Sequence, residues 1–165
     1  FAVNEKNRDN YFKNKRFRVT EVHDGDSVSI RISSPLGLPV RTERIRLIGI
    51  DAPELKQEPW GRISKRFLKK IISRSDWIVF VEFDIEQRDK YGRLLAYLWT
   101  KKGEMINEMM VLNGYATLYT IPPNVKYVDR LISAQRHAQI KKLGIWGKKG
   151  IKVTPEEWRK AHPRN

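Results

Sequence analysis

Three short segments of the sequence carry charged side chains where a hydrophobic core would not need them. These segments are HDGDS at 23–27, RLIGIDAPE at 46–54 and DKYGR at 89–93. Two carboxylates such as Asp26 and Asp51, completed by a backbone carbonyl and water, would suit a hard cation like calcium. Because a bound cation polarises a phosphodiester, this pairing raises the hypothesis of metal-assisted cleavage of a phosphate ester.

Charged residues nearby could supply the other groups that such a cleavage needs, a base and phosphate-binding side chains. Glu54 would lie beyond the metal ligands, where a carboxylate can orient or deprotonate a water molecule. Arg46 and Arg93, on separate strands, would clamp the phosphate and its transition-state charge. A planar guanidinium suits this role because it matches two phosphate oxygens at once.

Each of these positions also has an ordinary structural interpretation. Asp-Gly in a tight turn is a strong hairpin signal, so Asp24 and Asp26 need no metal. Glu54 follows a proline and could simply be solvated, and Arg46 could be an outward polar position on an alternating strand. The YGR stretch at 91–93 is a common hairpin turn. No single position therefore identifies catalysis.

Hydrophobic periodicity indicates the elements that would position these residues. Helical spacing of apolar residues follows Trp60, and two further helices are expected later in the chain, a short one stopped by Gly114 and another ending near 143. The alternating segments predict five strands, and the helical segments predict three helices. The strands are 16–22, 27–32, 40–50, 77–83 and 93–99, a turn lies at 33–39, and the helices lie at about 60–72, 105–114 and 125–143.

Two hairpins and one long strand, followed mainly by helices, predict an α+β fold that is mainly β. We expect a small antiparallel five-stranded barrel of the oligonucleotide-binding type, with helices packed on it. Strand ends and hairpin turns of such a barrel can converge on one mouth. The expected organisation is a flexible arm at 1–14, one barrel domain at 15–148 and a basic, loop-like tail at 149–165.

The charge balance narrows the class of partner. The chain has 165 residues, enough for one domain, and 33 Lys and Arg against 19 Asp and Glu give a net charge of +14. This favours a polyanion such as nucleic acid over an acidic small molecule. No run approaches the ~18 apolar residues of a spanning helix, and no basic segment has the bulky apolar face of a membrane-surface helix. We therefore expect no stable membrane insertion.

The chain has no cysteine, which excludes disulfides, thiolate catalysis and Cys-based zinc sites. His23, His137 and His162 are scattered without paired spacing, so oxygen atoms would have to hold any metal. The lack of cysteine fits an exported protein. Because the chain starts at Phe1, we expect a leader or anchor removed upstream and a secreted or surface-anchored location.

Taken together, these segments resemble the staphylococcal-nuclease-like, or thermonuclease, domains. The resemblance covers about 17–146, and its motifs are DGDS, RLIGIDAPE, DKYGRLLAYLW, GEMINE and LGIW. It implies a five-stranded oligonucleotide-binding barrel with three helices. By the same resemblance, Asp26 and Asp51 match the calcium carboxylates, and Ala52 stands where a main-chain carbonyl binds the ion. Asp24 matches an acidic position that tunes the site from outside.

The resemblance also implies the reaction. Glu54 matches the residue that activates or positions the attacking water, and Arg46 and Arg93 match the two phosphate-clamping arginines. The implied activity is calcium-dependent hydrolysis of DNA and RNA, breaking the bond to the 5′ oxygen and leaving 3′-phosphate ends. We expect a monomer that prefers single strands, with no protein partner.

Further matching positions concern the grip on a nucleotide. Lys90 and Tyr91 match residues that touch its terminal phosphate, and Tyr119 matches an aromatic residue that packs near the base. The sequence departs from the family close by: Ile121 replaces a second tyrosine, and Pro122 stands where a basic residue is common.

Two other function classes stay open at this point. The same barrel could bind single strands without cutting, or the basic surface could bind lipid. A pure binder has little use for three carboxylates facing a polyanion, because they repel phosphate unless a cation intervenes.

Overall fold

The computed structural model describes residues 15–33 and 40–164. The arm expected at 1–14 and the turn expected at 33–39, apart from Ser33, lie outside these residues. None of the helices in the described ranges is long and apolar enough to cross a membrane.

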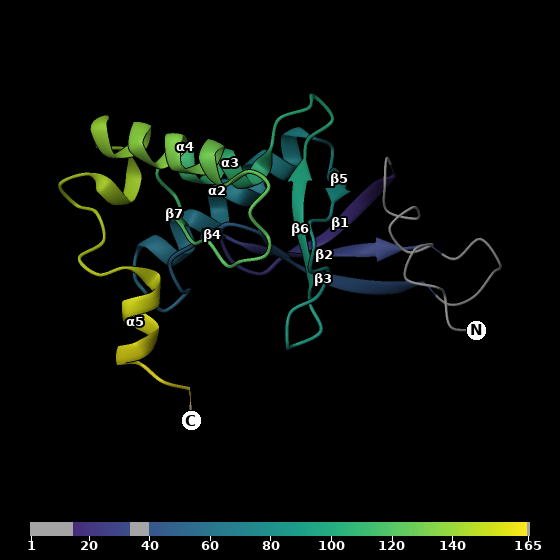
Figure 1. Ribbon diagram of the computed structural model, residues 1–165, viewed down its shortest axis with the longest axis horizontal. Helices are drawn as coiled ribbons and strands as arrows, with labels where there is room; N and C mark the ends of the chain where they lie inside the picture. Colours follow the sequence, from purple (N-terminus) through teal and green to yellow (C-terminus); the bar gives the residue numbers. More distant parts are fainter. Residues whose placement is uncertain (1–14, 34–39, 165) are drawn as a thin grey trace.

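Five strands close into a barrel in the order β1-β2-β3-β6-β5 (Figure 1), which confirms the predicted five-stranded barrel. The expectation of a fully antiparallel barrel is wrong at one seam: β3 and β6 pair in parallel, with Ile45 beside Leu94. The other four seams are antiparallel, and a closed ring with an odd number of strands must contain at least one parallel pair. The strands are β1 (Arg16–Val22), β2 (Ser27–Ile32), β3 (Arg41–Leu47), β5 (Ile78–Glu82) and β6 (Leu94–Trp99).

The strand predicted over 40–50 is broken before its end. β3 stops at Leu47, and Gly49 adopts a left-handed φ of 79°, which a residue with a side chain rarely adopts. The chain then forms β4 (Ile50–Asp51), which leaves the barrel and pairs with β7 (Thr117–Leu118). This turn places Asp51 beside the barrel end rather than along its wall.

Four α-helices occur in the described ranges, one more than expected. They are α2 (Trp60–Arg74), α3 (Ile106–Leu112), α4 (Val128–Ile140) and α5 (Pro155–Ala161), and a 3₁₀ turn spans Gly144–Trp146. The additional helix, α5, lies in the segment expected to be a loop-like tail. Thr154 and Glu157 cap it reciprocally and Pro155 occupies its first turn, so its start is set by a few local residues.

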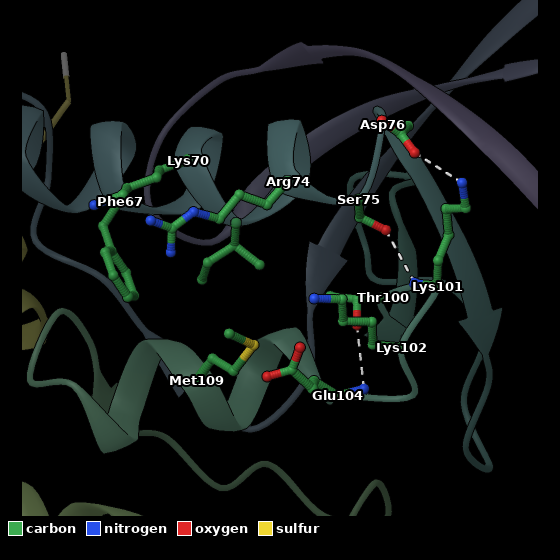
Figure 2. Close-up of a pocket in the computed structure, with 11 residues that line it drawn as sticks. Phe67, Lys70, Arg74, Ser75, Asp76, Thr100, Lys101, Lys102, Glu104 and Met109 are labelled. Carbon is green, nitrogen blue, oxygen red and sulfur yellow. Dashed lines mark hydrogen bonds and ion pairs between the residues drawn. The ribbon is translucent and has the colours of Figure 1, made fainter.

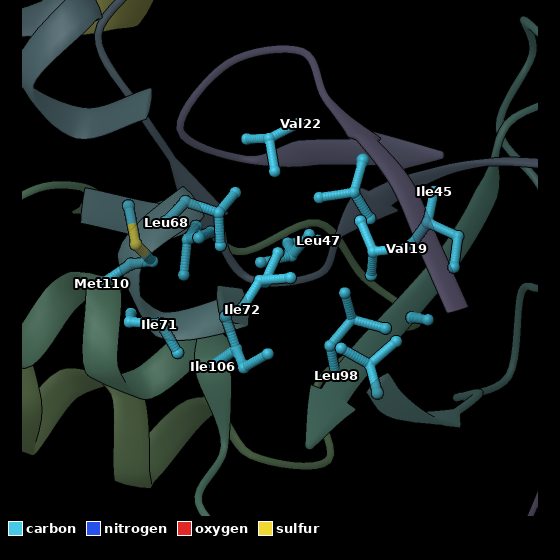
Figure 3. Packing of buried hydrophobic residues seen from close by; sticks show 14 of the residues in the cluster. Val19, Val22, Ile45, Leu47, Leu68, Ile71, Ile72, Leu98, Ile106 and Met110 are labelled. Carbon is cyan, nitrogen blue, oxygen red and sulfur yellow. The ribbon is translucent and has the colours of Figure 1, made fainter. Parts of the chain in front are cut away.

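The core lies between the barrel and the inner faces of α2 and α3 (Figure 3). Leu68 and Ile72 of α2 are fully buried, as are Ile45 of β3 and Ile106 of α3. Burying one such side chain stabilises the fold by about 1.5–3 kcal/mol, so this packing fixes α2 against the barrel.

A buried asparagine joins α3 to the site-bearing part of the chain. The amide nitrogen of Asn107 donates to the carbonyls of Ile48 and Ala96, at 2.9 and 3.2 Å, and its oxygen accepts the amide of Leu98 at 3.0 Å. Asn107 thereby fixes the turn that carries Gly49 and leads to Asp51.

Candidate active site

The fold brings the two predicted metal carboxylates together. Asp26 is the last residue of the turn between β1 and β2, and Asp51 lies in β4; both are buried, with exposed fractions of 7% and 2%. The Nη2 atom of Arg46 lies 3.4 Å from Oδ2 of Asp26 and 3.4 Å from Oδ1 of Asp51. Two carboxylates from distant segments therefore converge on one cationic group.

Main-chain hydrogen bonds fix this arrangement. The amide of Ala52 donates to Oδ2 of Asp26 at 2.7 Å, which ties the two acidic segments together. Arg46 donates through Nη1 to the carbonyls of Leu47 and Ile50, at 2.7 and 2.9 Å. Because Nη1 is held in this way, Nη2 points at the carboxylates.

A close approach at Gly25 is also required. A Cβ atom at this position would lie 2.6 Å from the Cβ of Ala52 and 2.8 Å from the Cβ of Ser64 in α2. Glycine therefore lets the turn carrying Asp26 pack directly on the segment that follows Asp51.

Burial raises the pKa of Asp26 to about 8. The charge of Arg46 and the amide of Ala52 act against this shift, whereas the nearby carboxylates of Asp24 and Asp51 add to it. Asp26 therefore holds a proton at neutral pH unless a further cation reaches it. A carboxylate in this condition is poised to exchange its proton for a metal ion.

Asp24 lies beside the pair and shapes the turn. Its Oδ1 accepts the amide of Asp26 at 3.0 Å and the hydroxyl of Ser27 at 2.9 Å. Burial pushes the pKa of Asp24 upward, but these hydrogen bonds outweigh burial and leave the pKa lowered. Asp24 thus stabilises the turn through its hydrogen bonds, a role that the Asp-Gly turn pattern allows. It is also a fixed negative charge next to Asp26.

Sequence reasoning missed one residue of this cluster, Arg159 of α5. Its Nη1 and Nη2 bind both oxygens of Asp51, at 2.9 and 2.8 Å, and Nη1 lies 3.1 Å from Oε1 of Glu54. These carboxylates raise the pKa of Arg159. Arg164 also approaches Oε2 of Glu54 at 3.6 Å, but its side chain is 91% exposed. The capping pair Thr154 and Glu157 is a signal from which α5 could have been predicted, but no pattern in the sequence predicts where α5 docks.

Arg93, by contrast, does not point at the carboxylate pair. Its Nε donates to Oδ2 of Asp89 at 2.7 Å, and its guanidinium lies over the ring of Tyr91 at 5.6 Å. Pairing of β6 with β3 still places Arg93 one strand away from Arg46. Its role in binding phosphate stays a prediction.

The three residues predicted to bind a nucleotide are exposed or partly exposed. Lys90 is 5.2 Å above the ring of Tyr91, which is 72% exposed at the tip of the β5–β6 loop. Tyr119 is half-buried, and its amide donates to the carbonyl of Gly49 at 2.8 Å. These roles also stay predictions.

The donor set fits a hard cation. Within residues 15–33 and 40–164, no group of three or more His, Cys, Asp or Glu side chains surrounds a common point. Asp26 and Asp51 would therefore need main-chain and water oxygens to complete a coordination sphere, as hard divalent cations accept. A guanidinium already shared by both carboxylates shows that this position favours positive charge.

The hollow in Figure 2 lies elsewhere. It has a volume of about 360 Å³ and is formed by α2, the end of β6 and the loop before α3. Lys70, Arg74 and Lys101 line it together with the apolar Phe67 and Met109. None of the predicted catalytic or metal-binding residues lines this hollow, so the candidate site is the carboxylate cluster.

Comparison with known proteins agrees with this geometry. Residues 44–148 match the family described as staphylococcal nuclease homologue. The chain is 37% identical to the thermonuclease of Staphylococcus intermedius over 139 residues, covering 81% of this chain and 77% of that protein. It is 33% identical to the thermonuclease of Staphylococcus hyicus over 135 residues, covering 79% and 75%. It is 31% identical to the endonuclease YncB of Bacillus subtilis over 134 residues, covering 77% and 59%. The chain therefore belongs to the staphylococcal nuclease homologue family, as its motifs had indicated.

Proposed function

We propose that this protein is a calcium-dependent nuclease that hydrolyses DNA and RNA and leaves 3′-phosphate ends. The observation that carries the proposal is the convergence of Asp26 and Asp51 on Arg46, with Glu54 beside them. The relatives named thermonuclease and endonuclease support the same activity.

Asp26 and Asp51, with the carbonyl of Ala52, would hold the calcium ion. When bound, the ion supplies positive charge that polarises the phosphodiester and offsets the carboxylates. The chain's own residues then position the reactants. Arg46 is anchored by main-chain carbonyls at the edge of the pair, where it can bind a phosphate oxygen while keeping its orientation.

Glu54 is the candidate base. It directs its carboxylate toward the cluster and holds a water proton as the water oxygen attacks phosphorus. The bond from phosphorus to the 5′ oxygen breaks, and that oxygen takes a proton from a solvent water molecule as it leaves. Arg93 pairs with Asp89 through Nε, and it would bind the phosphate through its terminal nitrogens.

The +14 net charge supports a polyanionic substrate. Lys90 and Tyr91, exposed beside Arg93, would touch the terminal phosphate, and Tyr119 would pack near a base. Exposed aromatic rings favour unstacked bases, so we infer a preference for single strands. The proposal includes a monomer that acts outside the cell or at its surface, which a cysteine-free chain suits.

The test is digestion of plasmid DNA and of RNA with calcium or with EDTA, using Glu54→Gln as the variant. Turnover should fall by at least about 100-fold in the variant, because a positioned base contributes roughly that much, while nucleotide affinity is kept. Glu58→Gln is the matched control, since Glu58 pairs with Arg62 on the exposed face of α2. Tight strand binding indifferent to calcium, without cleavage, would favour a non-catalytic binding module instead.

A further inference from the structure

The C-terminal helix is attached over the candidate site by a small set of contacts. Gln57 donates to the carbonyl of Val153 at 2.9 Å, and Trp60 donates to the carbonyl of Lys149 at 3.0 Å. Pro155 is buried at the start of α5. These contacts bring α5 beside β4 (Figure 1), although the helix lies beyond the residues that match the family.

Arg159 is the residue of α5 that enters the carboxylate cluster. It uses two nitrogens to bind both oxygens of Asp51, and one of these nitrogens also binds Glu54. Asp51 is 2% exposed, so its charge has little access to water and depends on this partner. A bidentate pair of this kind is stronger and more directional than a single-point ion pair.

The same oxygens are those proposed to bind calcium and to activate water. A divalent cation beside Asp51 would repel the guanidinium of Arg159, and the two would compete for one buried carboxylate. Arg159 also holds Oε1 of Glu54, one of the two oxygens with which Glu54 could accept a proton from water. Arg159 and a calcium ion therefore compete for Asp51, and Arg159 also occupies one oxygen of Glu54.

The helix that carries Arg159 can leave as a unit. α5 has seven residues, and its start is stabilised within itself by the Thr154 and Glu157 capping box. The segment before Thr154 is attached by hydrogen bonds from the side chains of Gln57 and Trp60 and from the amide of Ile151 to the carbonyl of Ile145, and water can replace the partners of such bonds once the segment moves. Movement of α5 requires no change in the barrel core.

We propose that Arg159 is a built-in counter-cation that closes the active site in the metal-free protein and that a divalent cation displaces together with α5. This inference rests on the proposed function, because it assigns the displacing ion to the site described there. The calcium concentration that the enzyme needs would then depend on how strongly Arg159 and α5 hold the site.

The test compares the full chain with Arg159→Gln and with Lys160→Gln as control. Lys160 lies on the same helix and pairs with Glu156, so its replacement removes one positive charge without freeing Asp51. Calcium affinity is measured by titration calorimetry without nucleic acid. Amide hydrogen exchange of residues 154–162 is followed with and without calcium.

Arg159→Gln should bind calcium about tenfold more tightly than the unmodified chain, as expected for losing one partly exposed bidentate competitor. Lys160→Gln should change the affinity by less than about threefold, since exposed charges are screened. Calcium should speed exchange in α5 of the unmodified chain, and in Arg159→Gln exchange should be fast with or without calcium.

An unchanged or weaker calcium affinity in Arg159→Gln overturns the proposal, as does calcium binding that leaves exchange in α5 unaltered. Weaker nucleotide binding with unchanged calcium affinity would instead make Arg159 a substrate-binding residue. Failure of the proposed function looks different: neither the unmodified chain nor any variant would then bind calcium or cleave nucleic acid.

Discussion

Replacing Asp26 by asparagine should stabilise the metal-free protein while abolishing its metal-dependent activity. Asp26 is buried, and its folded-state pKa of about 8 lies above the ordinary value of 3.8. The folded protein therefore keeps a proton that the unfolded chain has already released between these two values. Stability must fall as pH rises through this window, and the loss is complete above pH 8.

The size of the effect follows from the same shift. One pKa unit corresponds to about 1.4 kcal/mol, so the window from 3.8 to about 8 sets an upper limit of about 6 kcal/mol. Water entry and relaxation reduce such penalties, and we expect about 2–4 kcal/mol. Asp26→Asn removes this penalty, and its amide oxygen can still accept the hydrogen bond from Ala52.

Urea unfolding in EDTA, measured from pH 4.5 to pH 8.5, tests this prediction. The two proteins should have similar free energies of unfolding at the acidic end, and Asp26→Asn should become the more stable as pH rises. Asp76→Asn serves as control, because Asp76 is exposed and pairs with Lys101 at the surface. Parallel pH profiles for the unmodified chain and Asp26→Asn would refute the reasoning.

Three further substitutions test how the site is supported. Asn107→Ala removes the side-chain partner of the Ile48 carbonyl and of the Leu98 amide, while the carbonyl of Ala96 keeps the amide of Ile48, and should lower the free energy of unfolding in urea by about 3 kcal/mol. Gly61→Ala would set a Cβ 2.0 Å from the carbonyl oxygen of Glu54. It should lower the free energy of unfolding by about 1–3 kcal/mol and slow cleavage, and an unchanged cleavage rate would contradict this prediction. Thr154→Ala removes the cap of α5 and should weaken that helix by about 1 kcal/mol, seen as faster amide exchange in 155–161 with little change in the global unfolding midpoint.

The barrel and most of the cluster could be predicted because their signals are local or carried by shared motifs. Alternation located β1 and β2 at their observed bounds, and the Asp-Gly turn between them placed Asp26 at a strand end. The parallel pairing of β3 with β6 could not be predicted in this way. Strand order depends on contacts between distant segments, which a period of two does not encode.

Arg159 shows the same limit at the site. The residue types at Thr154, Pro155 and Glu157 indicate where its helix begins. Docking on Asp51 depends instead on tertiary contacts of Gln57 and Trp60 with the segment before the helix, which the sequence does not show. For Arg93, the sequence predicts the residue but not the orientation of its side chain. Its motif predicts a phosphate ligand, whereas in the structure its guanidinium pairs with the neighbouring Asp89.

The charges in the cluster explain why a metal-free binding module is the weaker alternative. Beside the fixed charge of Asp24, the carboxylates of Asp26, Asp51 and Glu54 carry three negative charges when ionised, and Arg46 and Arg159 supply two positive ones. The proton that Asp26 retains up to pH about 8 supplies the third. A divalent cation that displaces both that proton and Arg159 leaves the cluster equally balanced, so the exchange conserves the net charge of a buried region. Without the ion, the carboxylates are already paired with Arg46 and Arg159, and a phosphate gains no binding energy from them.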